Sequence, residues 1–334
     1  MIVKTISLTN FRNHATFRLD CNPDTTLILG ANGFGKTSVL EAIYILMQGK
    51  SFRATDPDIL KRGENFYRIE LEYTTGEKVV ATYDGKNKTF LVLDKKSRRL
   101  PAKNKYPIVL FEPRDLNLVS GAPSRRRDYF DRIFGQLSED YASALSKYEK
   151  ALRQRNELLK SETLSEASLF SWNLMLAKYG SIIENFRARL TDEINQNLGQ
   201  KYFSIAKNAD EISLSYKTEI KNLTESKYLE ILEQTIEKDH YLGHTSFGVH
   251  RDDIEFIFNN NSADGSASRG ETRSIILALK FTEAGIIADT LHKKPLVLLD
   301  DVFSELDSTR RKCLVENFKD HQVIITSTDY KVNN

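Results

Sequence analysis

The stretch at residues 27–44 constrains the fold more than any other part of this 334-residue chain. Its sequence, LILGANGFGKTSVLEAIY, reads as an apolar strand, a glycine-spaced loop and the start of an amphipathic helix. The loop fits G-x-x-x-x-G-K-[ST] at every fixed position, in the strand, loop and helix context that gives the pattern its meaning. Gly30, Gly33 and Gly35 allow a tight turn whose N–H groups point toward an anion at the positive end of the helix. These residues predict a nucleoside triphosphate site in an α/β fold.

Two side chains that follow the glycines carry the expected chemistry. Lys36 can reach the β- and γ-phosphates as a point charge, and we assign it a catalytic role. The hydroxyl of Thr37 can bind Mg²⁺. The residues predicted to hold ATP in this loop are Gly30, Ala31, Asn32, Gly33, Phe34, Gly35, Lys36, Thr37 and Ser38.

Composition limits the classes of protein that fit this loop. The chain is 40% hydrophobic and 28% charged, and it contains no apolar run of about 18 residues that would predict a membrane span. Lys and Arg (48) nearly balance Asp and Glu (46), so any surface for nucleic acid has to be local. The first residues do not resemble a signal peptide, and two cysteines in no metal-binding spacing favour a reducing compartment. We therefore expect a cytoplasmic protein with no membrane partner.

Period-two alternation of apolar residues predicts strands before and after the phosphate loop. The expected strands are 2–9, 15–20, 25–29, 66–74, 77–84, 88–94 and 106–111. The three at 66–94 form an antiparallel meander, because Thr75-Gly76 and Asp84-Gly85 are turn signals. Such a meander indicates an antiparallel sheet beside the nucleotide-binding sheet.

The most one-sided charge cluster follows the meander. Residues 86–105 contain eight Lys and Arg and a single acid, Asp94. Lysines at a sheet edge discourage strand-to-strand aggregation, which is one explanation. Contact with the phosphate backbone of DNA is the other, and the sequence leaves both open. The candidate DNA contacts are Lys95, Lys96, Arg98, Arg99, Lys103 and Lys105.

A helical region begins at Arg125. Two series of apolar residues recur every three or four positions, one at 129–152 and one at 172–198, with a linker at 161–168 between them. This pattern predicts a short antiparallel helical arm, about 45 Å long at about 1.5 Å per residue. A strand near 212–216 and a helix near 226–238 are expected next.

Two carboxylates complete the predicted site from the far end of the chain. Leu296–Leu299 form a buried strand that ends in Asp300 and Asp301. We assign Asp300 to the Mg²⁺ shell together with Thr37, and Asp301 to positioning or deprotonating the attacking water. Upstream, Ser268 and Gly270 stand at the start of a helix, where they form either a second anion-binding cap or an ordinary serine N-cap.

Taken in order, these motifs resemble the ATP-binding-cassette class of ATPases, and within it the heads related to SMC proteins. The similarity is closer to the RecF family, and it covers nearly the whole chain. The stretches that carry it are 8–13, 30–43, 49–53, 111–116, 121–128, 172–180, 248–253, 268–271 and 300–307.

The resemblance implies an ABC-type, SMC-like P-loop ATPase head of α/β class, with an antiparallel β subdomain and an inserted helical arm. Residues 1–122 would form the N-terminal part of the ATPase lobe, 123–240 the helical arm lobe, and 241–334 the C-terminal part with the signature, Walker B and D-loop motifs. It also implies roles in ATP binding for Arg12, Asn13, Ser268, Gly270, Glu271 and Asp307. Residues 268–271 would act on the γ-phosphate bound by a second copy, and Asp307 would lie in the loop that crosses the dimer interface.

The function that the resemblance implies is ATP-dependent DNA binding in recombinational repair and replication restart. ATP would favour a homodimer on duplex DNA near single-strand junctions, where RecR and RecO help to load RecA at gaps. Asp301 is shorter than the Glu of transporter-type cassettes, which predicts a weak Mg²⁺-dependent ATPase.

Thr328 takes the place of the switch histidine, and His250 is expected to be structural or coupling. The alternatives are an SMC-like ATPase acting on a protein partner and a transporter-type ATPase subunit. The resemblance also leads us to expect a further helix after residue 334.

Overall fold

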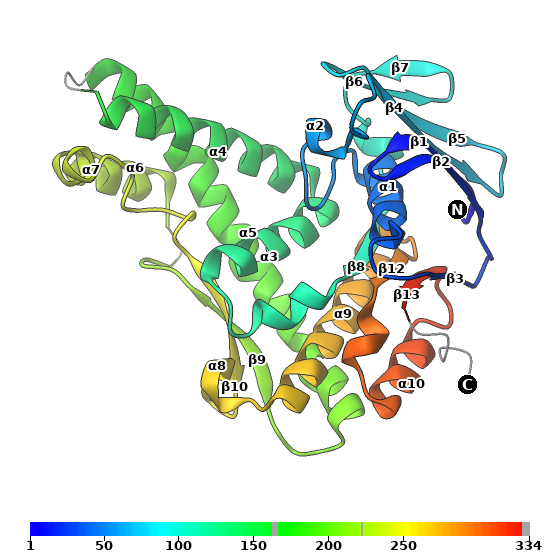
Figure 1. The fold of residues 1–334 in the computed structure, drawn as a ribbon. Helices are drawn as coiled ribbons and strands as arrows, with labels where there is room; N and C mark the ends of the chain where they lie inside the picture. Colours follow the sequence, from blue (N-terminus) through cyan, green and yellow to red (C-terminus); the bar gives the residue numbers. More distant parts are fainter. Residues whose placement is uncertain (162–165, 222, 329–334) are drawn as a thin grey trace. The chain divides into compact units, whose positions relative to one another are not determined.

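The structure is a computed structural model that describes residues 1–161, 166–221 and 223–328 (Figure 1). The chain divides into two compact units. The first, which we call the sheet unit, comprises Met1–Leu116 and Ala284–Asn334. The second, the helical unit, comprises Asn117–Glu283. Residues 162–165 of the expected linker at 161–168 lie outside the described residues.

An antiparallel sheet of six strands forms one layer of the sheet unit. Its order is β2-β1-β4-β5-β6-β7. The strands are β1 (Val3–Phe11), β2 (His14–Asp20), β4 (Tyr67–Tyr73), β5 (Lys78–Tyr83), β6 (Lys88–Val92) and β7 (Lys95–Ser97). The predicted meander is thus confirmed within two residues at each end. The edge strand β7 was missed because Lys95-Lys96-Ser97 has no apolar alternation.

A second, parallel sheet has the order β3-β13-β12-β8. Its strands are β3 (Thr25–Leu29), β13 (Val323–Ser327), β12 (Leu296–Asp300) and β8 (Ile108–Phe111). All three pairings are parallel, so the carboxyl ends of the strands meet at one edge. That edge is the usual ligand-binding edge of an open α/β sheet. It brings the loop after β3 to the end of β12.

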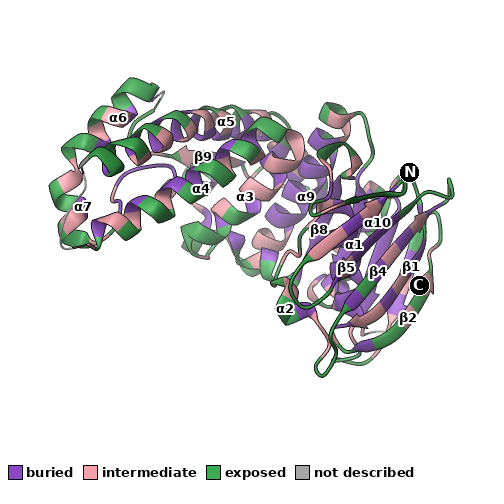
Figure 2. Ribbon diagram, turned by 90° about the horizontal axis from the view of Figure 1, so that it is seen from above, coloured by how far each residue is buried: buried purple, intermediate pink, exposed green. Residues whose placement is uncertain are grey.

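Helix α1 (Lys36–Gln48) contacts strands of both sheets, β1, β4 and β5 on one side and β12 and β13 on the other. The helix is largely buried (Figure 2), and Val39, Leu40, Ile43, Leu46 and Met47 are all buried residues. A helix covered on both sides loses the polar face of a surface helix, which explains the almost continuous apolar sequence. The remaining short elements of this unit are α2 (Asp56–Ile59), η1 (Ala102–Asn104), η3 (Val302–Glu305) and α10 (Ser308–Asn317).

The helical unit is built around two long helices, α4 (Glu139–Leu159) and α5 (Glu166–Ala206), which pack together as the predicted arm (Figure 1). A three-stranded antiparallel sheet has the order β11-β10-β9. Its strands are β9 (Ile212–Lys217), β10 (Asp253–Phe258) and β11 (Asn261–Ser262). The other helices are α3 (Pro123–Leu137), α6 (Glu225–Gln234), α7 (Ile236–Leu242) and α8 (Ala263–Ser266). Turn η2 (Pro113–Leu118) and helix α9 (Arg269–Leu291) span the boundary between the units in sequence.

The compact units differ from the three segments expected from the sequence. Residues 241–283, expected in the ATPase lobe, group with the helical unit because β10 pairs with β9 along its whole length. The helix expected at 226–238 is two helices, α6 and α7, that meet at Thr235. Neither a strand pairing across 40 residues nor a change of helix axis is visible in hydrophobic periodicity.

Candidate functional site

The phosphate loop is fixed by its glycines. Gly33 and Gly35 have φ angles of 83° and 90°, in the left-handed region that favours glycine. The loop rests on the turn between β1 and β2: the side-chain amide of Asn13 donates to the Gly33 carbonyl at 3.0 Å, and His14 Nε2 lies 3.1 Å from the Gly35 carbonyl oxygen. A side chain at Gly35 would meet Asn13 and His14 within 2.4 Å. The backbone therefore follows one path into α1.

Lys36 is held inside this loop. Its ammonium group donates to the carbonyl oxygens of Gly30 at 2.6 Å and Ala31 at 3.1 Å, and only 8% of the residue is exposed. The side chain thus folds back over the N–H groups at the start of α1. A cation in this position, beside the positive end of a helix, favours an anion there.

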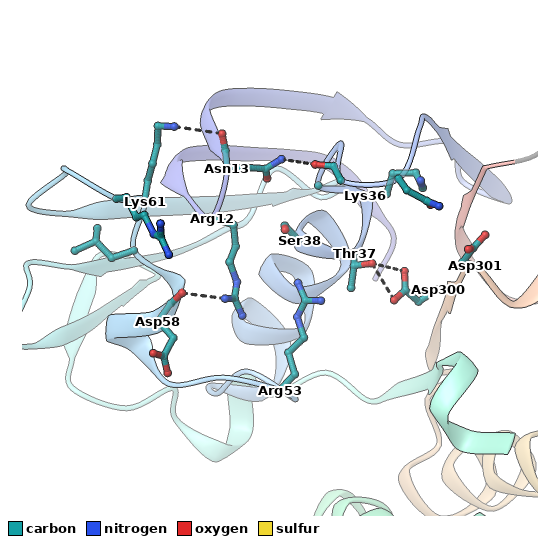
Figure 3. A pocket seen from close by; sticks show the side chains of 15 residues that line it. Arg12, Asn13, Lys36, Thr37, Ser38, Arg53, Asp58, Lys61, Asp300 and Asp301 are labelled. Atoms are coloured by element: carbon teal, nitrogen blue, oxygen red, sulfur yellow. Dashed lines mark hydrogen bonds between the residues drawn. The ribbon is translucent and has the colours of Figure 1, made fainter. Parts of the chain in front are cut away.

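The predicted metal ligands meet at the carboxyl edge of the parallel sheet. Thr37 Oγ1 donates to Asp300, lying 2.8 and 3.0 Å from its two carboxylate oxygens (Figure 3). Thr326 on β13 donates to Asp300 Oδ1 at 2.8 Å, which fixes the carboxylate from the neighbouring strand. A hydroxyl and a carboxylate are the hard oxygen ligands that Mg²⁺ prefers.

Asp301 occupies an unusual backbone conformation directly after β12. Its φ is 50°, and its N–H donates to the carbonyl and hydroxyl oxygens of Thr326 at 3.1 and 3.0 Å. Oxygen Oδ1 of Asp301 is buried and has no hydrogen-bond partner among the described residues. A buried carboxylate oxygen without a donor is costly, and such groups mark functional positions.

These residues line one pocket of about 640 Å³ (Figure 3). Of the predicted residues, the lining includes Arg12, Asn13, Asn32, Gly33, Gly35, Lys36, Thr37, Ser38, Asp300 and Asp301. Gly30, Ala31 and Phe34 belong to the same loop but not to the lining. The prediction missed five residues that follow α1 in sequence, namely Arg53, Asp58, Leu60, Lys61 and Arg62. Arg53 belongs to the stretch 49–53 that carried the family resemblance, so the sequence singled it out but assigned it no role in the site.

A buried carboxylate holds two arginines of this pocket. Glu41 on α1 accepts hydrogen bonds from Arg12, Arg53 and Ser51. Burial alone would raise the pKa of Glu41, but these hydrogen bonds outweigh it and hold the pKa below its usual value. Glu41 was missed because it lies in an apolar helix and does not itself line the pocket.

The residues assigned to the signature and the D-loop are helix caps in this chain. Ser268 and Glu271 form a capping box at the start of α9: the Ser268 N–H donates to Glu271 at 2.6 Å, and the Glu271 N–H donates to Ser268 Oγ at 3.3 Å. Asp307 caps α10 by accepting from the Arg310 N–H at 2.9 Å. The pocket lining contains none of Ser268, Gly270, Glu271 and Asp307. Their roles in ATP binding stay predictions.

The basic cluster lies on the hairpin of β6 and β7, at the edge of the six-stranded sheet, and on the segment that follows it through η1. Leu93 and Asp94 make its turn, both with positive φ. Lys88 is paired with Asp56 at 2.9 Å. All six candidate DNA contacts are exposed, and we call Lys95, Lys96, Arg98, Arg99, Lys103 and Lys105 the basic edge.

Two further features bear on the classes of protein considered. No helix in the described part of the chain is long and apolar enough to cross a membrane. Within residues 1–161, 166–221 and 223–328, no group of three or more His, Cys, Asp and Glu side chains could hold a metal ion.

A phosphate loop at the start of α1 and paired carboxylates at the end of a neighbouring parallel strand define a P-loop ATPase. The family description "AAA ATPase domain" matches residues 1–242. The chain is 32% identical to the DNA replication and repair protein RecF of Clostridioides difficile, over 98% of this chain and 92% of that protein. It is 34% identical to the RecF of Streptococcus pneumoniae, over 98% and 93% of the two chains. The chain belongs to the RecF family.

Solved structures agree with this assignment. The structure described as "recombination mediator protein RecF-ATPrS in RecFOR pathway" matches with a TM-score of 0.90 at 28% identity, over 99% of this chain and 94% of that chain. The corresponding RecF-ATP structure matches with a TM-score of 0.87 at 28% identity, over 99% and 92%. An Smc head domain from Pyrococcus furiosus, at 16% identity over 98% and 90%, has a TM-score of 0.53 and shows the shared fold alone. The predictions of a RecF-like ATPase and of an SMC-like head fold are confirmed.

Proposed function

We propose that this chain is an ATP-dependent DNA-binding protein of recombinational repair and replication restart. It dimerises on ATP, binds duplex DNA beside single-stranded gaps, and helps RecO and RecR to load RecA there. The observation that carries the proposal is the pocket in which Lys36 and Thr37 lie with Asp300 and Asp301, in a chain that belongs to the RecF family throughout its length. Cytoplasmic localisation is part of the same proposal.

The chemistry is phosphoryl transfer to water. The polyphosphate of ATP lies on the N–H groups at the start of α1, and Lys36 exchanges the carbonyls of Gly30 and Ala31 for phosphate oxygens. Thr37 and Asp300 would hold Mg²⁺, which would neutralise phosphate charge. The carboxylate of Asp301, which lines the pocket, accepts a hydrogen bond from the attacking water. An aspartate reaches less far than a glutamate, so hydrolysis is slow and times release of DNA.

A second copy of the chain completes each site. Ser268, Gly270 and Glu271 contribute the positive start of a 23-residue helix, and Ser268 is exposed. Asp307 lies in the exposed segment before α10. The proposal is that these residues act on ATP bound by the other subunit, so that ATP stabilises the dimer by mass action.

The basic edge is proposed as a contact with the DNA backbone. Within the described residues, Lys95, Lys96, Arg98, Arg99 and Lys103 have no acidic partner, unlike Lys88. Unpaired exposed cations clustered on one hairpin and the segment that follows it favour phosphates and carry no base specificity.

The experiment that tests this function measures affinity for a fluorescent gapped duplex at one fixed salt concentration. The protein is assayed with ATP and Mg²⁺, with ADP, and without nucleotide. We expect tight binding only with ATP, and we expect Lys36→Ala to lose both ATP binding and ATP-dependent DNA binding while remaining folded. DNA binding that is absent in all three states would favour the alternative, an SMC-like ATPase that acts on a protein partner.

A further inference from the structure

Glu41 occupies the centre of a buried ion cluster beside the nucleotide pocket. It lies on α1 one helical turn after Thr37, and its side chain is fully buried. Arg12 donates to both carboxylate oxygens at 2.8 Å. Arg53 donates to Oε2 at 3.1 and 2.9 Å, and Ser51 donates to Oε1 at 2.6 Å. One carboxylate thus accepts five hydrogen bonds, and it ties together the β1–β2 turn, α1 and the segment 49–53.

The cluster has more positive than negative charge. Two guanidinium groups share one carboxylate, which leaves about one positive charge uncompensated within it. Both arginines also line the pocket, where 22% of the Arg12 side chain and 29% of the Arg53 side chain are exposed. Figure 3 shows their guanidinium groups pointing toward one another beside Ser38 and Thr37.

The donors of the two arginines are only partly used. Arg12 makes one further hydrogen bond, from Nη1 to the Asp58 carbonyl at 2.9 Å. The Nη1 group of Arg53 has no hydrogen-bond partner among the described residues. An arginine fixed on one edge by a carboxylate presents its remaining N–H groups in a defined direction, which suits an oxyanion.

We propose that Glu41 is a positioning residue for ATP: it holds Arg12 and Arg53 so that their remaining donors bind the anionic part of the nucleotide. This inference rests on the proposed ATP binding and adds the residues that orient it. A fixed donor pair binds more tightly than two mobile side chains because the entropy of ordering them is already lost. The role of Glu41 is therefore indirect, since it acts through the two arginines.

Two opposite effects are expected when the carboxylate is removed, and they separate positioning from simple electrostatics. If Glu41 only reduced the positive potential of the pocket, Glu41→Gln would tighten ATP binding because it removes a negative charge. If Glu41 positions the arginines, the same change weakens binding. The NH₂ group of Gln cannot accept hydrogen bonds from the arginine N–H groups, so the guanidinium groups are released.

The test is calorimetric titration of the full chain with ATP and Mg²⁺ at fixed salt. We expect Glu41→Gln to weaken ATP binding by roughly 10- to 100-fold, the loss typical of charged hydrogen bonds. The matched control is Glu70→Gln, because Glu70 also pairs with two cations, Arg68 and Lys78, but lies on β4 away from the pocket lining. Its affinity for ATP should stay within twofold of the wild type.

A double-mutant background distinguishes positioning from a general loss of structure. In Arg12→Ala/Arg53→Ala, adding Glu41→Gln should change ATP affinity less than twofold, because the side chains that it positions are gone. Should Glu41→Gln fail to fold, Arg12→Ala and Arg53→Ala each test the same contacts and should each weaken binding at least fivefold.

Unchanged or tighter ATP binding by folded Glu41→Gln would overturn the inference and leave the proposed function intact. A further large loss in the double-alanine background would overturn it too, since Glu41 would then act through the fold. Wild-type protein that binds no ATP would overturn the proposed function itself.

Discussion

Gly35 shows how strongly single residues determine the phosphate loop. Its φ is 90°, and a methyl group there would lie 2.3 Å from Asn13 Oδ1 and 2.4 Å from His14 Nε2. Gly33, two residues earlier, has a similar φ of 83°, but a methyl group there would meet nothing within 4 Å. The two positions therefore separate the cost of backbone strain from the cost of a steric clash.

We predict that Gly33→Ala lowers the free energy of unfolding by about 1–2 kcal/mol, the cost of a left-handed conformation for alanine. Gly35→Ala should cost about 3 kcal/mol or more, because Asn13 and His14 also have to move. Urea denaturation of the two variants and the wild type checks this. Equal losses would show that the β1–β2 turn yields easily and does not fix the loop.

For single residues, the sequence predicted those that belong to a local motif, and missed those whose importance depends on contacts with distant residues. Lys36 and Thr37 were predicted as site residues because the phosphate-loop pattern places them, and Asp300 and Asp301 because they end a buried apolar strand; the structure brings all four to one pocket. Glu41 was not predicted, because its proposed role depends on two arginines that reach it from other segments. Pairings between distant segments leave no periodic signal in one sequence.

The hairpin of β6 and β7 is the element whose role can be tested most directly. Replacing Lys95, Lys96, Arg98 and Arg99 by alanine should weaken DNA binding and leave ATP binding unchanged. Each lost phosphate contact reduces the slope of log affinity against log salt by about 0.9, so we predict a decrease of roughly 3–4. Titrations of a duplex at several salt concentrations measure the slope.

The matched control removes four other exposed lysines of the same unit, Lys293, Lys294, Lys312 and Lys319. It makes the same change in net charge. If both variants lose the same slope, the attraction is general, and the basic edge serves only to protect the sheet edge.

Among the elements, long strands and helices with regular spacing were predicted well. The meander and the α4–α5 arm are examples. Their signals are local, since alternation or three-to-four spacing shows within a dozen residues. The pairing of β9 with β10 joins residues about 40 positions apart and had no such signal.

For the whole molecule, the proposal requires an ATP-bound dimer. We predict that Asp301→Asn binds ATP but hydrolyses it more slowly, so the dimer should persist instead of dissociating. Light scattering after size-exclusion chromatography, with saturating ATP and Mg²⁺, measures the mass. Lys36→Ala is the control that should stay monomeric, and a monomeric Asp301→Asn protein under these conditions would contradict the composite site.

Stability of the helical unit should depend on His250. Its Nε2 lies 3.1 Å from the Thr245 carbonyl, so Nε2 carries the proton and Nδ1 accepts from the Tyr148 hydroxyl at 2.8 Å. Burial lowers the pKa of His250 to about 4, well below that of an exposed histidine. This neutral ring agrees with the structural or coupling role expected from the sequence.

A lowered pKa in the folded state means that the unfolded chain binds the proton first. The contribution of His250 is therefore complete above about pH 6.5 and is lost as the pH falls to about 4. We predict a loss of about 3 kcal/mol across this window. Urea denaturation of His250→Gln should show a smaller dependence on pH than the wild type. Burial also lowers the pKa of His321. The same measurement on His321→Gln therefore shows whether replacing another histidine with a lowered pKa changes the pH dependence as His250→Gln does.

The hydrogen bond between Thr37 and Asp300 joins residues that are 263 positions apart. A ribosome adding about 5–20 residues per second would make Asp300 about 15–50 s after Thr37. During synthesis the phosphate loop exists without the carboxylate predicted to bind its metal and without β12 and β13, the central strands of its sheet. The nascent chain therefore cannot assemble a working ATPase until the segment that carries β12 and β13 leaves the ribosome, and a chain truncated before residue 296 would carry the loop without the activity.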